Sequence, residues 1–184
     1  MSINRQSFQS LITALDLRPH PEGGHYREVF RSGLRVSFQG TQRSAGTSIY
    51  YLLAQGAHSA WHRIDADEIW CFHAGGLLDL HVLLTDGGLR THRLGDALAH
   101  PGAVYQAAVP AGSWFAAELA DPDDFVLAGC LVAPGFEFSG FRLADEADMA
   151  DAVGRHGAWI RRLLAKPDGS REAAEDRPGG LYPG

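Results

Sequence analysis

His62 and Glu68 are the two side chains of this sequence whose types and spacing are best suited to chemistry. They fall in residues 56–75, a segment typical of a strand, a tight turn and a second strand. Residues of equal parity share one face of a strand, and a turn through residues 63–67 can bring both side chains to one concave surface. An imidazole and a carboxyl group that meet there form an acid/base pair or half of a metal site. We predict both as catalytic residues of an interior pocket; a buried histidine satisfied by one hydrogen bond is the alternative.

Aromatic side chains on these and neighbouring strands are candidates for binding a ligand. The predicted aromatic box for a sugar or another planar ring consists of Trp70, Phe72, Trp114 and Phe115. Each of them taken alone also suits an ordinary core position. Tyr50 and Tyr51 have opposite parity, so one of them faces the cavity and can serve as an acid near the imidazole. The sequence does not decide between the two tyrosines.

Glu22 and Tyr26 are further binding candidates, because they lie in a glycine-rich segment next to these strands. The pair Gly23-Gly24 can adopt positive φ and turn the chain sharply into a following strand over residues 25–31. The segment can cover the pocket as a lid or exchange onto a partner subunit. A plain structural turn is the alternative.

The remaining histidines and the cysteines suggest no second site. The histidines that we predict at the surface are His20, His92, His100 and His156. Cys71 and Cys130 lie inside apolar, strand-like runs, so we expect two free, buried thiols in a reducing compartment. A disulfide between neighbouring strands is the competing interpretation.

The elements that must position these side chains are mostly short strands, which predicts an all-β sandwich or barrel. The expected strands are residues 48–53, 59–64, 68–73, 78–84, 89–94, 104–109, 113–119, 125–132 and 137–142. Asp86-Gly87-Gly88 predicts a hairpin. Apolar residues at helical spacing predict a short N-terminal helix, with Ser7 as a cap, and short helices after Glu146.

The segment around His62 resembles the first motif of the cupin superfamily, with Gly56, His62, Glu68 and Gly75 in register. Residues 110–115, Pro-Ala-Gly-Ser-Trp-Phe, resemble the second motif. The stretches 21–28, 47–53, 67–70 and 133–138 resemble an uncharacterised cupin family that is similar in fold to dTDP-keto-sugar epimerases. The resemblance covers about residues 10–145. It implies a cupin double-stranded β-helix, a jelly-roll barrel that is usually paired as a homodimer.

The sequence departs from the cupin metal-binding pattern at two positions. Ile64 replaces the second histidine of the first motif, and Phe115 replaces the histidine of the second motif. His62 and Glu68 alone would hold a divalent ion weakly, because catalytic transition-metal sites usually use three or more protein ligands. Further histidines on these strands that could serve as ligands instead are His58, His73 and His81. We expect no tightly bound metal and no other cofactor.

Length and composition fit one soluble domain over residues 1–165, followed by a polar, flexible tail over residues 166–184. The formal net charge is −6, and no basic block marks a nucleic-acid binder. No apolar run approaches the ~20 residues that span a bilayer, and no signal peptide is expected. We therefore predict a cytoplasmic protein whose partners are a small molecule and a second copy of the chain, without nucleic acid or membrane.

Three hypotheses about function follow. In the first, a metal-independent isomerase or epimerase acts on a carbohydrate-like or keto-acid substrate, with His62 abstracting a proton next to a carbonyl and Glu68 orienting the imidazole. In the second, the barrel binds or senses a small ligand without turnover. In the third, a metal-dependent cupin enzyme uses an incomplete or unusual ligand set. The sequence names no substrate for any of them.

Overall fold

The computed structural model describes residues 4–165, so the tail predicted over residues 166–184 lies outside the described residues. The helices are α1 (Asn4–Ala14), η1 (Phe138–Gly140), α2 (Ala150–His156) and η2 (Ala158–Leu163), of which η1 and η2 are 3-10 helices. The first strands are β1 (Arg18–Pro19), β2 (His25–Arg31), β3 (Arg35–Phe38), β4 (Thr41–Ser44), β5 (Thr47–Ala54) and β6 (His58–Arg63). The later strands are β7 (Asp67–Gly75), β8 (Leu78–Leu83), β9 (Leu89–Leu94), β10 (Gln106–Val109), β11 (Trp114–Leu119), β12 (Phe125–Ala133) and β13 (Arg142–Leu143).

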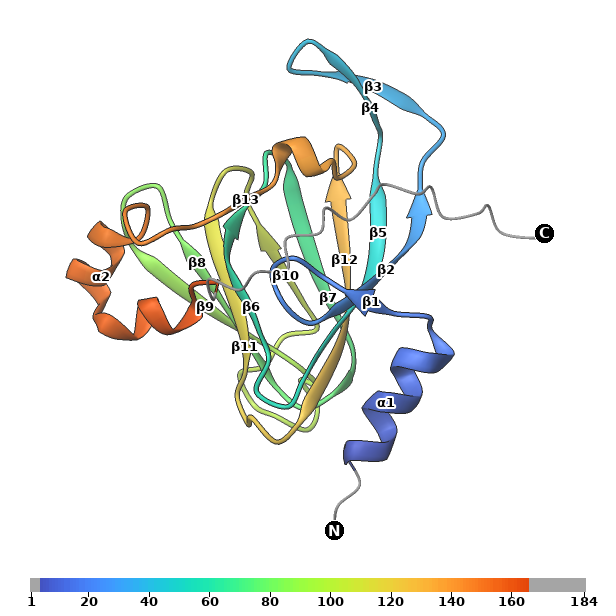
Figure 1. Cartoon of the computed structure of the whole chain (residues 1–184), viewed down its shortest axis with the longest axis vertical. Helices are drawn as coiled ribbons and strands as arrows, with labels where there is room; N and C mark the ends of the chain where they lie inside the picture. The colour runs from blue at the N-terminus through green and yellow to red at the C-terminus, as the bar shows by residue number, and fades with distance from the viewer. Residues whose placement is uncertain (1–3, 166–184) are drawn as a thin grey trace.

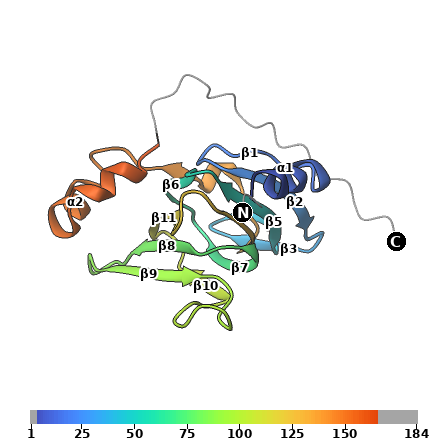
Figure 2. The ribbon, with the colours of Figure 1, turned by 90° about the horizontal axis from the view of Figure 1, so that it is seen from below.

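Two antiparallel sheets face each other and form the predicted jelly roll (Figures 1 and 2). One has six strands in the order β1-β2-β5-β12-β7-β10, and the other has five in the order β13-β6-β11-β8-β9. Side chains of both sheets, such as Trp70 and Phe115, fill one core between them. The hairpin β3–β4 projects away from the barrel (Figure 1). The fold class is therefore confirmed as all-β with a few short helices.

Helices cover parts of the outer faces of both sheets and lie on opposite sides of the barrel (Figures 1 and 2). Leu52 and Leu127 of the six-stranded sheet pack against apolar side chains of α1. Trp61 of the five-stranded sheet packs under α2 and η2, and its indole N–H donates to the carbonyl of Ile160 at 3.0 Å. The helical spacing at both ends of the sequence therefore reflects faces that bury apolar surface against the barrel.

Most strands lie where the alternation of apolar and polar residues predicts them, with ends shifted by a residue or two. The strand β9 has the predicted bounds, and the Asp86–Gly88 turn joins it to β8 through a bond from the Leu84 N–H to the Gly88 carbonyl. Cys71 and Cys130 are free thiols, as predicted, although Cys71 is only partly buried. Within residues 4–165 no helix is long and apolar enough to cross a bilayer.

Two local predictions are wrong, and one hairpin was not predicted. The expected strand over residues 137–142 is a 3-10 turn followed by the two-residue β13, because the chain folds its phenylalanines inward at Phe138 and Phe141. Ser7 lies inside α1, which begins at Asn4, and so it is no cap. The hairpin β3–β4 was not expected. Its turn residues Gln39 and Gly40 have φ of 48° and 81°, which suits a tight hairpin turn, but its strands are too polar to give a clear pattern.

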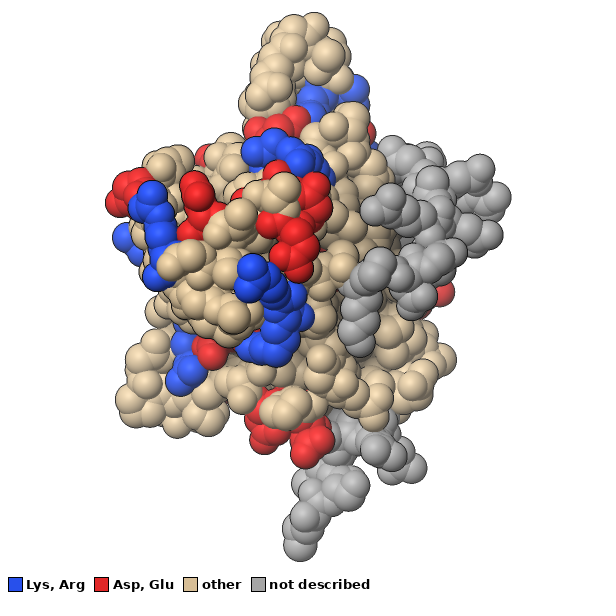
Figure 3. Space-filling view, turned by 60° about the vertical axis from the view of Figure 1, so that its left-hand side comes forward, with Lys and Arg blue, Asp and Glu red and all other residues tan. Residues whose placement is uncertain are grey.

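The outer face of the six-stranded sheet carries an exposed apolar row that α1 does not cover. Backbone register aligns Phe30, Ser48, Leu131, Ile69 and Ala108 across five neighbouring strands. The three large apolar side chains are 43–50% exposed. On the face shown in Figure 3, by contrast, Lys and Arg are interspersed with Asp and Glu, and no extended basic surface gathers there. A row of this kind suits contact with another protein surface.

The homodimer stays a prediction, and this row is where we expect the two copies to meet. Light scattering at micromolar concentration should give the mass of two chains for the wild type. Leu131→Glu should give the mass of one chain, because a carboxylate would be buried in an apolar contact. The control Leu98→Glu, at a 92% exposed loop position, should leave the mass unchanged. A monomeric wild type would contradict the prediction.

Candidate functional site

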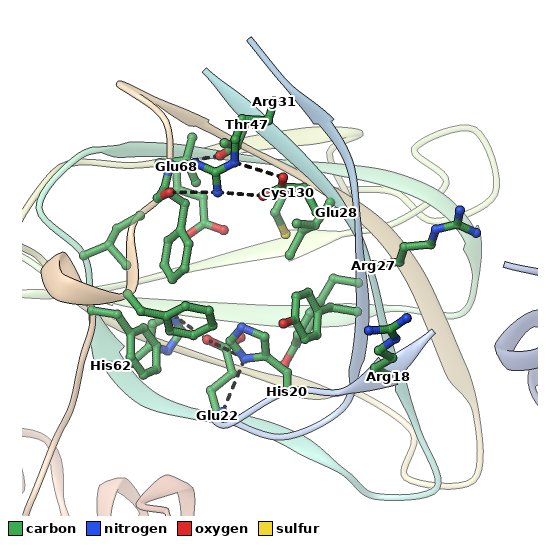
Figure 4. A pocket seen from close by; sticks show the side chains of 18 of the residues that line it. Arg18, His20, Glu22, Arg27, Glu28, Arg31, Thr47, His62, Glu68 and Cys130 are labelled. Atoms are coloured by element: carbon green, nitrogen blue, oxygen red, sulfur yellow. Dashed lines mark hydrogen bonds and ion pairs between the residues drawn. The ribbon is translucent and has the colours of Figure 1, made fainter. Parts of the chain in front are cut away.

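A cavity of about 350 Å³ opens between the two sheets of the barrel (Figure 4). It is lined by five of the residues predicted from sequence, namely Glu22, Tyr26, Tyr51, His62 and Glu68. Its other acidic, basic and sulfur-containing lining residues are Asp16, Arg18, His20, Arg27, Glu28, Arg31 and Cys130. The uncharged remainder consists of Thr47, Ile49, Ile64, Val132, Phe136, Phe138 and Phe141. The prediction that His62 and Glu68 share one interior pocket therefore agrees with the geometry.

The carboxyl group next to His62 belongs to Glu22 and not to Glu68. His62 Nε2 lies 3.0 Å from Glu22 Oε2, and the Ser59 hydroxyl donates to Glu22 Oε1 at 2.9 Å. Glu22, Ser59 and His62 are all buried. Within the described residues Glu68 makes no ion pair or hydrogen bond with His62, and it lies across the pocket from Glu22 in Figure 4. The expectation that Glu68 orients the imidazole is therefore corrected.

Hydrogen bonding fixes where the protons of His62 lie. Its Nδ1 is 2.7 Å from the carbonyl oxygen of Ala60, which can only accept, so Nδ1 carries a proton. The 3.0 Å contact between Nε2 and Glu22 Oε2 then needs one more proton, held by the imidazole or by the carboxyl group. Glu22 and His62 therefore form an acid/base pair with a proton shared between them.

A β-bulge aims Ser59 and His62 at the same carboxyl group. On β11 the paired residues move from Phe115 to Ala117, an advance of two residues. Their partners on β6 move from His62 to Ser59, which is three residues, so β6 has one extra residue at this point. Residues 59 and 62 have opposite parity and would face opposite sides of a regular strand. The bulge turns both toward the interior, which is a common use of bulges at functional sites.

Two glycines bring Glu22 into the barrel. Gly23 and Gly24 have φ of 115° and 68°, which confirms the predicted positive φ. A Cβ on Gly23 would lie 2.1 Å from the carbonyl oxygen of His58, so the loop lies directly against β6. The Ala60 N–H donates to the Glu22 carbonyl at 2.8 Å, and the Tyr51 hydroxyl donates to the Gly23 carbonyl at 2.8 Å. The segment is therefore part of the cavity wall.

His20 was predicted at the surface and instead lines the cavity, with a side chain only 6% exposed. Its Nδ1 lies 3.5 Å from Glu22 Oε2 and accepts a hydrogen bond from the Glu22 backbone N–H. Burial lowers the pKa of His20; the charge of Glu22 opposes this shift, and His62 adds to it. The imidazole is therefore neutral near pH 7. The sequence signal that we overlooked was its place between two prolines next to Gly23-Gly24.

Glu68 lies near the start of β7, where its wall neighbours are mainly apolar. Burial and, after it, the negative charge of Glu22 raise its pKa to about 8. The thiol of Cys130 and the indole of Trp70 partly oppose the rise. At neutral pH Glu68 is therefore mostly protonated, so it can donate a hydrogen bond to an oxygen atom in the cavity.

Tyr51 and Cys130 also face the cavity and stay protonated. Burial raises the pKa of the Tyr51 hydroxyl well above its ordinary value, and burial likewise raises that of the Cys130 thiol. Tyr51 is the cavity-facing member of the tyrosine pair. Tyr50 points to the outer face, where it packs against the α1 cluster and the ring of His73.

The four side chains of the predicted aromatic box do not line the cavity. Phe115 is fully buried and its ring centroid lies 3.9 Å from that of His62, so it supports the imidazole from behind. Trp70 and Phe72 belong to the core between the sheets. Trp114 faces outward under the guanidinium group of Arg63. None of these four is among the residues that line the cavity within the described part of the chain, and their binding roles find no geometric support.

A different set of aromatic side chains lines the cavity. Phe136, Phe138 and Phe141 come from the turn after β12 and pack against one another with centroids 5.0–6.2 Å apart. Tyr26, which was predicted, completes this wall next to His20 at 4.6 Å between ring centroids. The sequence placed the phenylalanines on a strand, where only alternate residues would have faced inward, and so missed the cluster.

The residues present do not fit the metal site of the cupin pattern. Ile64 and Phe115 occupy two of the four ligand positions, and both ring nitrogens of His62 are already bonded. His81 lies elsewhere, bonded to Thr91 and Glu118. In the described residues no three His, Cys, Asp or Glu side chains are grouped so as to hold a metal ion.

Comparison with known proteins agrees with this fold. Residues 9–144 match the sequence profile of a protein family described as Cupin superfamily (DUF985). A hypothetical protein from Leishmania major is 34% identical, with a TM-score of 0.78 over 86% of this chain and 98% of its own. A Shewanella oneidensis protein is 38% identical, with a TM-score of 0.76 over 88% and 98%. A cupin 2 domain-containing protein from Halorhodospira halophila, at 10% identity and a TM-score of 0.55, shares the fold over 82% and 89%. No curated protein matches the sequence.

Gly23→Ala tests whether the loop needs glycine to carry Glu22. We expect a loss of at least about 1–2 kcal/mol from the left-handed backbone alone, with a further loss from the clash with the His58 carbonyl. The control Gly154→Ala, where a Cβ meets open space in α2, should be neutral or stabilising. Urea unfolding gives both values, and equal stability of the two variants would contradict the role of Gly23.

The raised pKa of Glu68 predicts a specific pH dependence of the free energy of unfolding. Because its folded pKa of about 8 lies above its ordinary value of 4.5, the contribution of Glu68 to stability is complete below pH 4.5 and is lost as the pH rises to about 8. The loss reaches at most about 1.4 kcal/mol per pH unit. Thermal unfolding from pH 6.5 to 8.5 should show a downward slope that Glu68→Gln removes. The control Glu146→Gln, at an exposed carboxylate, should keep the slope.

Proposed function

This chain belongs to the DUF985 family of the cupin superfamily, and we propose that it binds a small carbonyl compound in the barrel and exchanges a proton on the carbon next to the carbonyl group. The class of compound is carbohydrate-like or a keto acid, and the reaction is an isomerisation or epimerisation without a metal. The observation that carries the proposal is a pair of buried carboxyl groups facing one cavity from different environments. Such a difference between two titratable groups assigns an acid and a base.

Glu22 is the base in this proposal. Its carboxyl group lies in the cavity wall, where the Ser59 hydroxyl and the His62 imidazole hold it in one orientation. It would take a proton from the carbon next to the substrate carbonyl, breaking the C–H bond and forming an O–H bond. His62 would act as a positioning residue that compensates the charge of Glu22 through Nε2.

Glu68 is the acid. Its protonated carboxyl group would donate a hydrogen bond to the carbonyl oxygen as the electrons of the broken C–H bond move onto that oxygen. The resulting enolate, held by this hydrogen bond, would then take a proton on carbon. In isomerisation of a hydroxycarbonyl compound, Glu22 would return its proton to the former carbonyl carbon while the proton of the neighbouring hydroxyl group moves to the first oxygen. In epimerisation, water would protonate the original carbon on its opposite face, and Glu22 would lose its proton to solvent. The neutral form of Glu68 is needed for this role, so activity should fall above about pH 8.

A second candidate is binding without turnover. The observation that favours it is that both ring nitrogens of His62 are already occupied, one by Ala60 and one by Glu22. A dyad of this kind can serve only to keep a buried carboxyl group satisfied. Binding would then raise the melting temperature with ligand concentration, but no proton would exchange.

Deuterium uptake from heavy water separates the two candidates. A panel of keto sugars and keto acids is incubated with the protein and followed by proton NMR. Exchange should be catalysed by the wild type and fall by about 10²–10⁴-fold in Glu22→Gln. His62→Asn should lower it as well, whereas the exposed His100→Asn should leave it unchanged. Ligand-dependent thermal stabilisation without any exchange would support binding alone, and the absence of both would contradict the proposal.

A further inference from the structure

The inner end of the cavity carries no net positive charge, because Glu22 and His62 share one proton and neutralise each other. We define this end by its buried polar side chains, His20, Glu22, Tyr51, His62 and Glu68. Among the described residues that line the cavity, the arginines are Arg18, Arg27 and Arg31, and no lysine is present. What those three arginines contact decides whether an anion could bind at the inner end.

Arg31 is held by carboxylates outside the inner end. Its guanidinium group lies 2.8 Å from Glu28 and 3.0 Å from Glu137, and it also donates to the carbonyl of Phe136. Two acidic partners already compensate its single charge. A ligand carboxylate would have to displace one of them to bind this arginine.

The other two arginines lie at the outer end. The Arg18 side chain is 71% exposed and has a loose partner in Asp16 at 3.9 Å, while Arg27 is exposed and donates to the carbonyl of Leu15. In Figure 4 both lie on the opposite side of the pocket from His62. Charges so exposed are screened by water and salt, and they attract little at the buried end.

The groups at the inner end instead match uncharged oxygen functions. Glu68 donates in its protonated form, and Glu22 accepts. A protonated carboxyl group can bond a carbonyl or hydroxyl oxygen, and a carboxylate can bond a hydroxyl proton. Tyr26 and Phe138 flank the imidazole of His20, with ring centroids 4.6 and 6.3 Å from it, and offer flat apolar surface to carbon-bound hydrogens.

We infer that the inner end of the cavity takes an uncharged hydroxycarbonyl group and rejects a carboxylate at the same position. The inference rests on the proposed function, because it concerns the same cavity, and it selects the carbohydrate-like class over the keto acids. The physical reason is that a ligand carboxylate would lose its hydration in a buried space where Glu22 and His62 already neutralise each other, so no net positive charge remains to compensate the charge of the ligand.

Hydroxyacetone and pyruvate test this inference as a matched pair. They share the methyl ketone and differ only in a hydroxymethyl group or a carboxylate. Saturation-transfer NMR titrations at pH 7 should give hydroxyacetone a dissociation constant at least about tenfold lower than that of pyruvate, a difference expected when a charge is buried without a partner of opposite sign. The wild-type comparison needs no variant and so does not depend on the folding of a mutant.

Two charge-removing variants locate the cause. Glu22→Gln should reduce the preference for hydroxyacetone to about threefold or less, because the positive charge that His62 can carry is then no longer neutralised and can pair with a ligand carboxylate. Glu146→Gln removes an equal charge at a 68% exposed position and should keep the wild-type preference. Equal or tighter binding of pyruvate by the wild type would overturn the inference and leave the proposed function standing. Absence of binding and of deuterium exchange for both compounds would overturn both.

Discussion

The polar interior of this barrel depends on one buried contact, the hydrogen-bonded pair of Glu22 and His62. A carboxyl group inside an apolar barrel is costly unless other polar groups compensate it. Here the compensation comes from β6, where the bulge directs both Ser59 and His62 toward Glu22. The loop that carries Glu22 is in turn fixed by Gly23, whose carbonyl accepts the Tyr51 hydroxyl. Segments far apart in the sequence are thereby tied to a single carboxyl group.

Glu68 shows what happens to a carboxyl group that lacks such partners. It lies across the same cavity and keeps its proton, because burial and the charge of Glu22 raise its pKa to about 8. The two carboxyl groups therefore differ in chemistry although they share a space. The proposed proton exchange depends on this difference between the two carboxyl groups. The inferred preference for an uncharged ligand depends on it too, and also on the placement of the arginines outside the inner end of the cavity.

The sequence predicted the barrel well, because period-two patterning and turn glycines report strands directly. It also predicted that His62 and Glu68 share one pocket, with Glu22 and either Tyr50 or Tyr51 as candidates beside them. It could not pair them correctly, because Glu22 reaches His62 from a loop whose path depends on two positive-φ glycines and not on strand periodicity. His20 was misplaced for a related reason: its burial is decided by the packing of a loop, and loops carry no periodic signal.

The most direct test is the imidazole of His62, observed by long-range proton–nitrogen NMR in histidine-labelled protein. The account predicts a protonated Nδ1 and an Nε2 whose shift reports a proton shared with a carboxyl group. Glu22→Gln should move the Nε2 signal strongly, and Glu68→Gln should leave it almost unchanged. A signal that responds to Glu68→Gln and ignores Glu22→Gln would contradict the arrangement on which the site is built.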